Sequence, residues 1–258
     1  MHIAVLVKVV PDTYGERRIA LETGLVDRTV GDTVVDEIGE RAVEAALTLG
    51  EAIPDTRVTV VSMGPPEAAD PLRKTLAMGA DGAVHIADDA LVGADLTLTA
   101  EVLAAAVRRL GPDLVLLGNV STDGGGAVLG AMLAEHLGFA QITNLNAIES
   151  DGTLVRGTRV TEQGTSVVEA ELPAVASITE ALPDPRFPSM RNVMSAKRKP
   201  VETLTAAELG ADVAGEQAAR ALVIAAAAAP ARAAGTTVVD EGDGGRLLAE
   251  FLIARGLV

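Results

Sequence analysis

The residues with the clearest chemical potential are glycines in the middle of the chain. Residues 113–138 read DLVLLGNVSTDGGGAVLGAMLAEHLG, with three consecutive glycines at Gly124–Gly126. The apolar run Asp113–Leu117 is typical of a strand buried on both faces. An apolar repeat that ends at Gly138 predicts a helix, with its inner face at Val128, Leu129, Met132, Leu133 and Leu137. Strand, glycine loop and helix N-terminus direct bare backbone N–H groups at one point, which predicts a nucleotide-phosphate site.

This glycine loop lacks the side chains of familiar catalytic loops. It has no Gly-Lys-Ser/Thr ending, Gly130 comes one place late for a dinucleotide fingerprint, and no G-x-S-x-G elbow surrounds Ser121. We expect Asp123 to cap the following helix rather than to act as a base. No acid–base pair or activated nucleophile can be assembled along the chain, which favours a carrier or binding protein over a hydrolase or an NAD-dependent enzyme. Tight packing of the loop without any ligand is the alternative reading.

Composition excludes several classes of protein. The 258 residues are 48% hydrophobic but only 2% aromatic, and the formal net charge of −15 argues against a nucleic-acid partner. The absence of cysteine excludes disulfides, thiolate metal sites and Fe–S clusters, and the three histidines form no metal-binding pattern. The N-terminal run carries no basic leader, and the apolar tract 221–229 is far shorter than the roughly 20 residues of a membrane span. We therefore expect a cytoplasmic protein without membrane insertion.

Strands and helices alternate along the first half of the chain. We predict strands at Ile3–Val9, Arg57–Ser62, Ala83–Ile86 and Asp113–Leu117, and helices at 36–49, 66–78, 96–110 and 128–137. Such a run of units predicts an α/β fold with a doubly wound, mainly parallel, Rossmann-like sheet. The loops at Lys8–Asp12, Met63–Pro66 and Gly118–Gly126 should then converge at the carboxyl ends of the strands. Asp36 is a candidate cap for the helix after the long connection Val10–Val35, whose length indicates a functional loop or one that covers a partner surface.

After Gly138 the pattern changes to short strands with turns at Asp151-Gly152 and Gln163-Gly164. There is no room for helices between these strands, which predicts an antiparallel extension of the same sheet. The strands are expected at Ile142–Ile148, Leu154–Val160, Ser166–Glu171 and Ala174–Ile178.

Two later segments depart from the compact domain. Residues 183–199, PDPRFPSMRNVMSAKRK, combine large apolar residues with basic neighbours, which fits either a covered surface loop or a protein-docking loop. Residues 210–239 are alanine-rich and predict an extended arm, which ends in a short amphipathic helix at 242–257 with Leu247, Leu248, Phe251 and Leu252 on one face. We therefore divide the chain into a nucleotide-binding domain at 1–209 and an arm at 210–258, which either wraps a partner or folds back.

Distinctive segments occur in a fixed order along the chain: VLVKVVPD, DEIGERAVEAAL, SMGP with RKTLAMGAD, DLVLLGN with STDGGG, R-x-x-E-Q-G with ELPAV at 159–175, PRFPSM with NVMSAKRK, and DEGDGG. Together they resemble the β subunit of electron transfer flavoprotein over nearly the whole chain. The resemblance implies an electron carrier without catalytic residues of its own. Such a chain pairs with an α subunit that holds most of one FAD, accepts electrons from acyl-CoA and other dehydrogenases, and passes them to a membrane quinone oxidoreductase.

The resemblance also implies sites. The β chain would bind a structural AMP at Leu6, Asp36, Glu37, Ile38, Gly39, Met63, Gly118, Asn119, Val120, Ser121, Thr122, Asp123, Gly124, Gly125, Gly126, Ala127, Val128 and Leu129. Thr13 and Ile38 fall where the family brings β residues near the flavin. The segment 183–199 resembles the loop that anchors dehydrogenases, with docking residues at Arg186, Phe187, Met190 and Met194.

The chain departs from the family pattern at a few positions. Many members carry a Gln-Thr pair where Val128 and Leu129 stand, and some have an aromatic residue in place of Ile38. Two alternatives stay open: a bifurcating β subunit with a second FAD in place of AMP, and a universal-stress-like ATP-binding regulatory module. The second should stand alone as a homodimer and lack both the docking loop and the arm.

Overall fold

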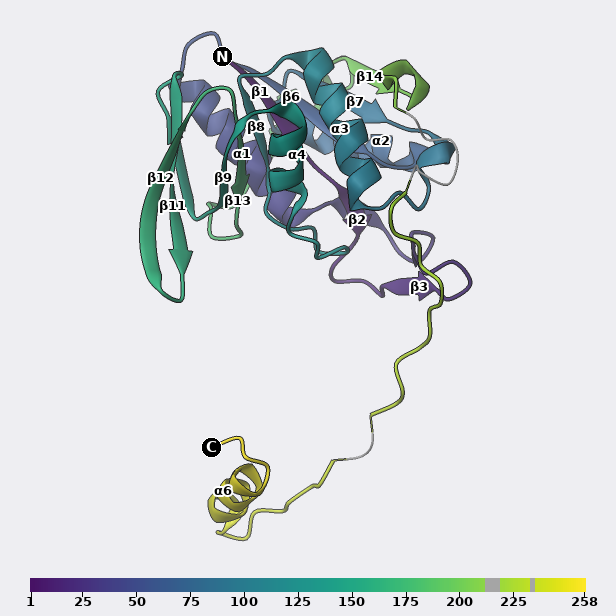
Figure 1. Cartoon of the computed structure of the whole chain (residues 1–258), viewed down its shortest axis with the longest axis vertical. Coiled ribbons are helices and arrows are strands. Elements are labelled where there is room, and N and C mark those ends of the chain that lie inside the picture. Colours follow the sequence, from purple (N-terminus) through teal and green to yellow (C-terminus); the bar gives the residue numbers. More distant parts are fainter. Residues whose placement is uncertain (212–218, 233–234) are drawn as a thin grey trace. The chain divides into compact units, whose positions relative to one another are not determined.

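The computed structural model of the chain shows two compact units, residues 1–226 and residues 227–258 (Figure 1). It describes residues 1–211, 219–232 and 235–258. Residues 219–226 belong to the larger unit, so the arm predicted at 210–258 is divided between the two units. Residues 212–218 and 233–234 of the predicted arm lie outside the described residues.

A seven-stranded sheet forms the centre of the larger unit, in the order β14-β7-β6-β1-β8-β13-β9. Every neighbouring pair in it is parallel, which confirms the predicted doubly wound fold. The chain runs outward from β1 to β6 and β7 and then returns to the other side of β1 with β8, so the direction of winding reverses between β1 and β8. The strands are β1 (His2–Leu6), β6 (Arg57–Met63), β7 (Gly82–Ile86), β8 (Leu114–Gly118), β9 (Ala140–Leu145), β13 (Ala174–Ile178) and β14 (Val201–Leu204).

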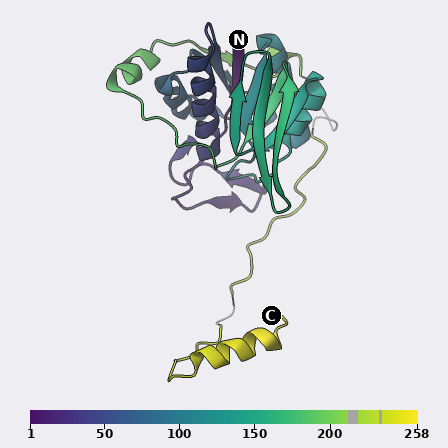
Figure 2. The ribbon, with the colours of Figure 1, turned by 90° about the vertical axis from the view of Figure 1, so that its left-hand side faces the viewer.

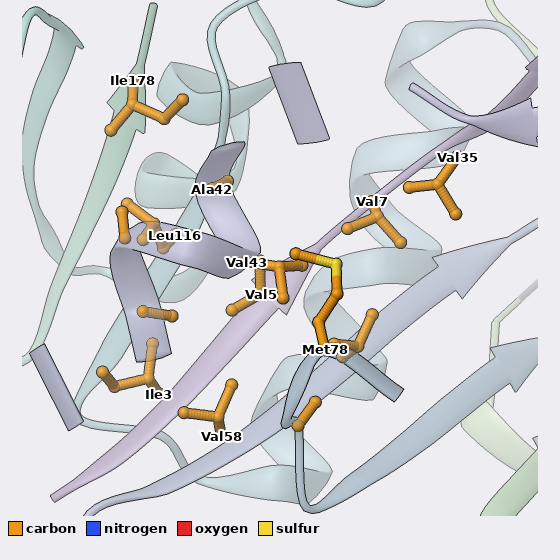
Figure 3. Close-up of a cluster of buried hydrophobic side chains, with 14 of the residues drawn as sticks. Ile3, Val5, Val7, Val35, Ala42, Val43, Val58, Met78, Leu116 and Ile178 are labelled. Carbon is orange, nitrogen blue, oxygen red and sulfur yellow. The ribbon is translucent and has the colours of Figure 1, made fainter. Parts of the chain in front are cut away.

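Helices cover both faces of this sheet, and each face buries its own apolar cluster. Successive strand residues point to opposite faces, so Leu116 of β8 joins one cluster and Leu117 the other. Helices α1 (Glu37–Ala52) and α2 (Ala69–Met78) cover the first cluster, and α3 (Leu96–Leu110) and α4 (Leu129–Leu137) cover the second. Figure 3 shows the first cluster, in which branched aliphatic side chains such as Ile3, Val5 and Val43 fill the space without aromatic rings.

The antiparallel part of the fold differs from the prediction. Strands β9 and β13 join the central sheet in parallel, whereas β10 (Ala147–Ser150), β11 (Leu154–Thr161) and β12 (Gly164–Glu171) form a separate three-stranded antiparallel sheet (Figure 2). Burial explains the division, because every residue of β13 is buried whereas no residue of β12 is. The predicted turns at Asp151-Gly152 and Gln163-Gly164 do connect these strands.

The long connection after β1 contains two small antiparallel ladders rather than a plain loop. One joins β2 (Val9–Pro11) to β5 (Thr33–Val35), and the other joins β3 (Arg18–Ala20) to β4 (Leu25–Asp27). Its arginines hold it together and attach it to the glycine loop: Arg28 donates to the carbonyl of Val9 in β2 at 2.8 Å, and Arg17 donates to the carbonyl of Thr122 at 2.9 Å.

The smaller unit contains the predicted C-terminal helix, α6 (Gly244–Ala254). Asp240 accepts hydrogen bonds from the N–H groups of Gly242 and Gly244, both at 2.8 Å, in the turn before the helix. Leu248, Phe251 and Ile253 are exposed within this unit. Within the described part of the chain, no helix combines the length and the apolar character needed to cross a membrane.

Candidate functional site

The carboxyl ends of three central strands meet around a cavity of about 1100 Å³. The segments after β1, β6 and β8 all line it, as the strand order predicts, because this is where the winding of the sheet reverses. The connection between β2 and β5 and the start of α3 supply further walls.

Three aspartates organise the rim of this cavity in the same way. Each uses one carboxylate oxygen to cap a helix and the other to hold a segment that is distant in sequence. Asp36 caps α1 through the N–H of Ile38 at 3.1 Å, as predicted, and its second oxygen accepts both the N–H and the hydroxyl of Thr122 at 2.7 Å. Asp36 is only 2% exposed, so these bonds replace the water that its charge would otherwise require.

The other two aspartates, Asp88 and Asp95, repeat this arrangement. Asp88 caps the 3₁₀ turn Asp89–Leu91 through Ala90 and holds the N–H of Ala206, both at 3.0 Å. Asp95 caps α3 through Leu98 and also holds the segment that begins at Arg220. The glycine loop, the segment after β14 and the start of the arm are thus each attached to the rim by one carboxylate.

Asp123 does not cap α4, and that prediction is wrong. Helix α4 begins after Val128 without a side-chain cap, and the carboxylate of Asp123 lies instead 2.7 Å from the Lys8 ammonium and 3.3 Å from the Arg28 guanidinium. Burial alone would raise the pKa of Asp123, but the hydrogen bond and charge of Lys8, with help from Ser121 and Arg28, hold that pKa below its ordinary value. Asp123 is therefore ionised at neutral pH.

Lys8 and Arg28 were not predicted as site residues. Both side chains are partly exposed, both residues line the cavity, and together they carry two positive charges against the single charge of Asp123. The only sequence signal was the position of Lys8 directly after a strand end; nothing local marks Arg28. The ion cluster of Lys8, Arg28 and Asp123 therefore has one positive charge in excess, which beside a glycine loop and a helix N-terminus suits an anionic group such as a phosphate. Among the described residues that line the cavity, the other charged ones are all acidic, so this cluster is its one positive point.

The glycines of the loop allow close approach of the backbone. A Cβ atom on Gly118 would lie 2.9 Å from Ile38, and one on Gly126 would lie 2.9 Å from Leu96. Gly125 and Ala127 both have a left-handed backbone, with φ of 63° and 56°. For Ala127 this conformation is strained, and such strain is common where a loop is shaped for a ligand.

The structure brings most of the predicted nucleotide residues together. Of the predicted residues, those that line the cavity are Leu6, Asp36, Gly39, Met63, Gly118, Asn119, Val120, Ser121, Asp123, Gly124, Gly126, Ala127 and Leu129. Those predicted residues that do not line it are Glu37, Ile38, Thr122, Gly125 and Val128. Thr122 fixes the glycine loop instead, because its backbone N–H and its hydroxyl both donate to Asp36.

The two residues predicted to lie near a flavin differ in environment. Thr13 is half-buried in the connection after β2, next to Tyr14, whose side chain is almost fully exposed. Ile38 is only 5% exposed and packs against Gly118, so its side chain faces the core. Their proximity to a flavin stays a prediction, and for Ile38 the backbone would have to make the contact.

Residues 183–199, which we call the docking loop after its predicted role, present apolar side chains on a tethered base. Helix α5 (Met190–Ala196) begins at the cap Ser189 and packs against α2. Phe187, Met190 and Met194 are 98%, 80% and 69% exposed. The positive charges predicted to lie beside them are partly used within the chain.

Arg186 and Lys199 fix the two ends of the docking loop. Arg186 pairs with Glu44 at 2.8 Å and Glu51 at 2.5 Å on α1, and the hydrogen bonds that it donates to these carboxylates raise its pKa further. Lys199 donates to the carbonyls of Leu76, Gly79 and Ala80 at the end of α2. In this structure Arg186 therefore holds the loop rather than presenting a free charge. The described residues contain no group of three or more carboxylate or histidine side chains that could hold a metal ion.

Comparison with known proteins gives one consistent result. The family described as electron transfer flavoprotein domain matches residues 23–209. The electron transfer flavoprotein subunit beta of Mycobacterium leprae is 43% identical over 100% of this chain and 99% of its own length. That of Megasphaera elsdenii is 38% identical over 82% of this chain and 81% of its own length. The caffeyl-CoA reductase-Etf complex subunit CarD of Acetobacterium woodii is 35% identical over 81% of this chain and 80% of its own length. With matches of this extent, the chain belongs to the electron transfer flavoprotein family and is one of its β subunits.

Proposed function

We propose that this chain is the nucleotide-binding β subunit of a heterodimeric electron carrier and that its cavity holds a structural AMP. The observation that carries the proposal is the ion cluster of Lys8, Arg28 and Asp123, with one positive charge in excess, beside the glycine loop and at the point where the sheet reverses its winding. The loop backbone and the N-terminus of α4 would hold the phosphate, and the apolar wall at Met63 and Leu129 suits a base.

The electron-carrying group would be one FAD held mainly by an α subunit. Bound FAD would supply the redox chemistry, and no residue of this chain is proposed to act as an acid, base or nucleophile. The chain would contribute the flavin-facing surface near Thr13 and the docking surface for electron donors. Acyl-CoA and other dehydrogenases are the proposed donors, and a quinone oxidoreductase is the proposed acceptor.

The exposed tips of Phe187, Met190 and Met194 support the docking part of the proposal. A few apolar anchors supply most of the binding energy of a typical interface, and a tethered base lowers the ordering cost of presenting them. Arg186 and Lys199 provide such tethers at the two ends of the loop.

The size of the cavity favours one alternative. At about 1100 Å³ it exceeds the roughly 300–1,000 Å³ of ordinary small-molecule pockets, so it leaves room for more than a mononucleotide. A second FAD in place of AMP is therefore the competing occupant, as in a bifurcating electron transfer flavoprotein.

One experiment separates these readings. The chain is co-purified with its α subunit, the visible spectrum is recorded, and the released nucleotides are quantified by chromatography. One FAD and one AMP per heterodimer is the expected result. Two FAD would establish the alternative, whereas a flavin-free homodimer that binds ATP would overturn the proposal in favour of a regulatory module.

A further inference from the structure

Asp95 connects the rim of the cavity to the root of the C-terminal arm, which we define as residues 220–224. One oxygen of Asp95 accepts the N–H of Leu98 at 2.9 Å and so caps α3. The other oxygen accepts the backbone N–H groups of Arg220 and Ala221, both at 2.9 Å. The Arg220 guanidinium also lies 3.1 Å from Glu101, farther along α3.

A second contact places the arm root against the connection between β3 and β4. A Cβ atom on Gly24 would lie 2.3 Å from Cγ1 of Val223, so Val223 packs directly on the glycine backbone. Gly24 has φ of 71° and lies between β3 and β4, and it lines the cavity together with Asp95. Figure 1 shows the yellow-green chain leaving the sheet beside the purple β3 ladder.

We propose that Asp95 is a positioning residue that fastens the arm root to the rim of the nucleotide cavity. Two backbone donors converge on one carboxylate oxygen, and charge-assisted bonds of this kind are stronger than neutral ones. Their direction is set by α3, because the same carboxylate is already fixed by the helix cap. We call this contact the clasp, and it fixes the arm root at the rim.

Fixing the arm root has a consequence for assembly, which rests on the proposed function. If the arm binds the α subunit, a fixed root raises the effective concentration of its terminal helix at the partner surface. Without the clasp the same helix would search from a longer free tether, and the entropic cost of binding would rise.

The clasp also links the arm to the cavity. Because Asp95 and Gly24 line the cavity, a nucleotide bound there stabilises the rim on which the arm root lies. Such a linkage is reciprocal: a ligand that favours the fastened root is itself bound more tightly when the root is fastened.

The substitution Asp95→Asn separates the two uses of this side chain. Asparagine is as good a helix cap as aspartate, but its second group is an NH₂ donor, which cannot accept from Arg220 and Ala221. Asp88→Asn is the matched control, because Asp88 caps a turn and holds Ala206 in the same manner but does not contact the arm root.

The measurement is hydrogen exchange by mass spectrometry on the intact heterodimer, read on peptides that cover residues 219–226. We expect the amides of Arg220 and Ala221 to exchange about tenfold faster or more in Asp95→Asn, as for the loss of a hydrogen bond to a charged group. Asp88→Asn should leave these peptides unchanged. Unchanged exchange in Asp95→Asn, or an equal increase in both variants, would overturn the clasp.

Two further measurements test its consequences. AMP added to the nucleotide-depleted heterodimer should slow exchange in the same peptides, and no change on addition would refute the linkage to the cavity. Deletion of residues 227–258 tests the partner-binding role of the arm independently. If the truncated pair dissociates no faster while Asp95→Asn still loses its protection, the clasp stands and the proposed role of the arm falls.

Discussion

Charged side chains are usually exposed and apolar ones buried, and the rim of the cavity and the docking loop each depart from one half of this rule. The rim buries charge: Asp36 is 2% exposed and the Asp123 side chain 3%. The docking loop exposes apolar groups, with Phe187 at 98% and Met190 at 80%. Buried charges are tolerated because each has its partners within the chain, whereas the exposed apolar tips have no such compensation. Under the proposed function, a small polar ligand completes the rim and another protein covers the loop.

Both regions nevertheless rely on the same device at their base. The rim aspartates hold backbone N–H groups of distant segments, and in the docking loop Lys199 holds three backbone carbonyls at the end of α2. In both regions, a single charged side chain thus holds a segment that is distant from it in sequence. The comparison predicts that substitutions at the rim alter stability and nucleotide content, whereas substitutions at the loop tips alter only recognition.

The largest effect is expected for Asp36→Ala. This substitution removes the cap of α1 and leaves both donors of Thr122 without their acceptor, so we expect a loss of about 3 kcal/mol in the free energy of unfolding. Because the glycine loop loses its attachment, bound nucleotide should also decrease. Urea unfolding and nucleotide analysis measure the two effects. Asp151→Ala, in the exposed turn between β10 and β11, is the control, and an equal loss there would remove the distinction between rim and surface.

Met190→Ala tests the opposite half of the comparison. Truncation of an exposed anchor should weaken docking of an electron-donating dehydrogenase by about tenfold or more, while the unfolding free energy and the flavin and nucleotide contents stay unchanged. Electron transfer measured at limiting concentrations of the donor reports the docking effect. Val160→Ala, another exposed apolar residue but on β11, should leave the rate as it is. If Met190→Ala also leaves the rate unaltered, the loop tip is not a docking anchor.

The sequence predicted the regular elements more fully than the contacts between them. The helix at 96–110 has the predicted bounds because its apolar period is a local signal. The charges of the site could not be assigned in this way. Asp123 looked like a cap by its position, but its partners lie at Lys8 and Arg28, which only the folded sheet brings near.

The same limit applies to the docking loop and to the antiparallel strands. Lys199 belongs to a basic run that resembles a binding patch, yet it caps α2 more than a hundred positions earlier in the chain. The strands after residue 138 were recognised as strands, but whether each is buried on one face or two depends on helices packed from elsewhere. Local patterns specify elements, whereas charge partners and sheet membership are properties of the tertiary structure.

A smaller effect is expected from a matched pair of substitutions in the glycine loop. Gly125→Ala places a Cβ atom in open space but in the left-handed conformation, so strain alone should cost about 1 kcal/mol. Ala127→Gly relieves the same strain, and we expect stabilisation of about 0.5 kcal/mol after the larger entropy of the unfolded chain is subtracted. Thermal unfolding of the two variants measures both changes. Residues 183–199 are all described, and none of them has a positive φ, so the docking loop offers no such pair. Shifts of the same sign in both variants would show that conformation does not govern this loop.

The smallest effect distinguishes the two regions by acidity. Burial alone would raise the pKa of Glu44 at the base of the docking loop, but hydrogen bonds from Arg186 bring it below the ordinary 4.5, and Lys8 similarly keeps the pKa of Asp123 below 3.8. A carboxyl with a lowered pKa in the folded state stabilises the protein above its ordinary value and loses that contribution as the pH falls through the lowered one. Acid should therefore weaken the loop base from about pH 4.5 downward and the cavity ion cluster only below about pH 3.8. Because Glu44 and its partners are partly exposed, its contribution should stay below about 1 kcal/mol. Melting temperatures are measured from pH 6 to pH 3. As the pH falls below about 4.5, the melting temperature of Glu44→Gln should decrease less steeply than that of the unsubstituted protein, and Asp123→Asn should show the same difference only below about pH 3.8. If both variants depart from the unsubstituted protein at the same pH, the loop base and the cavity do not titrate as separate regions.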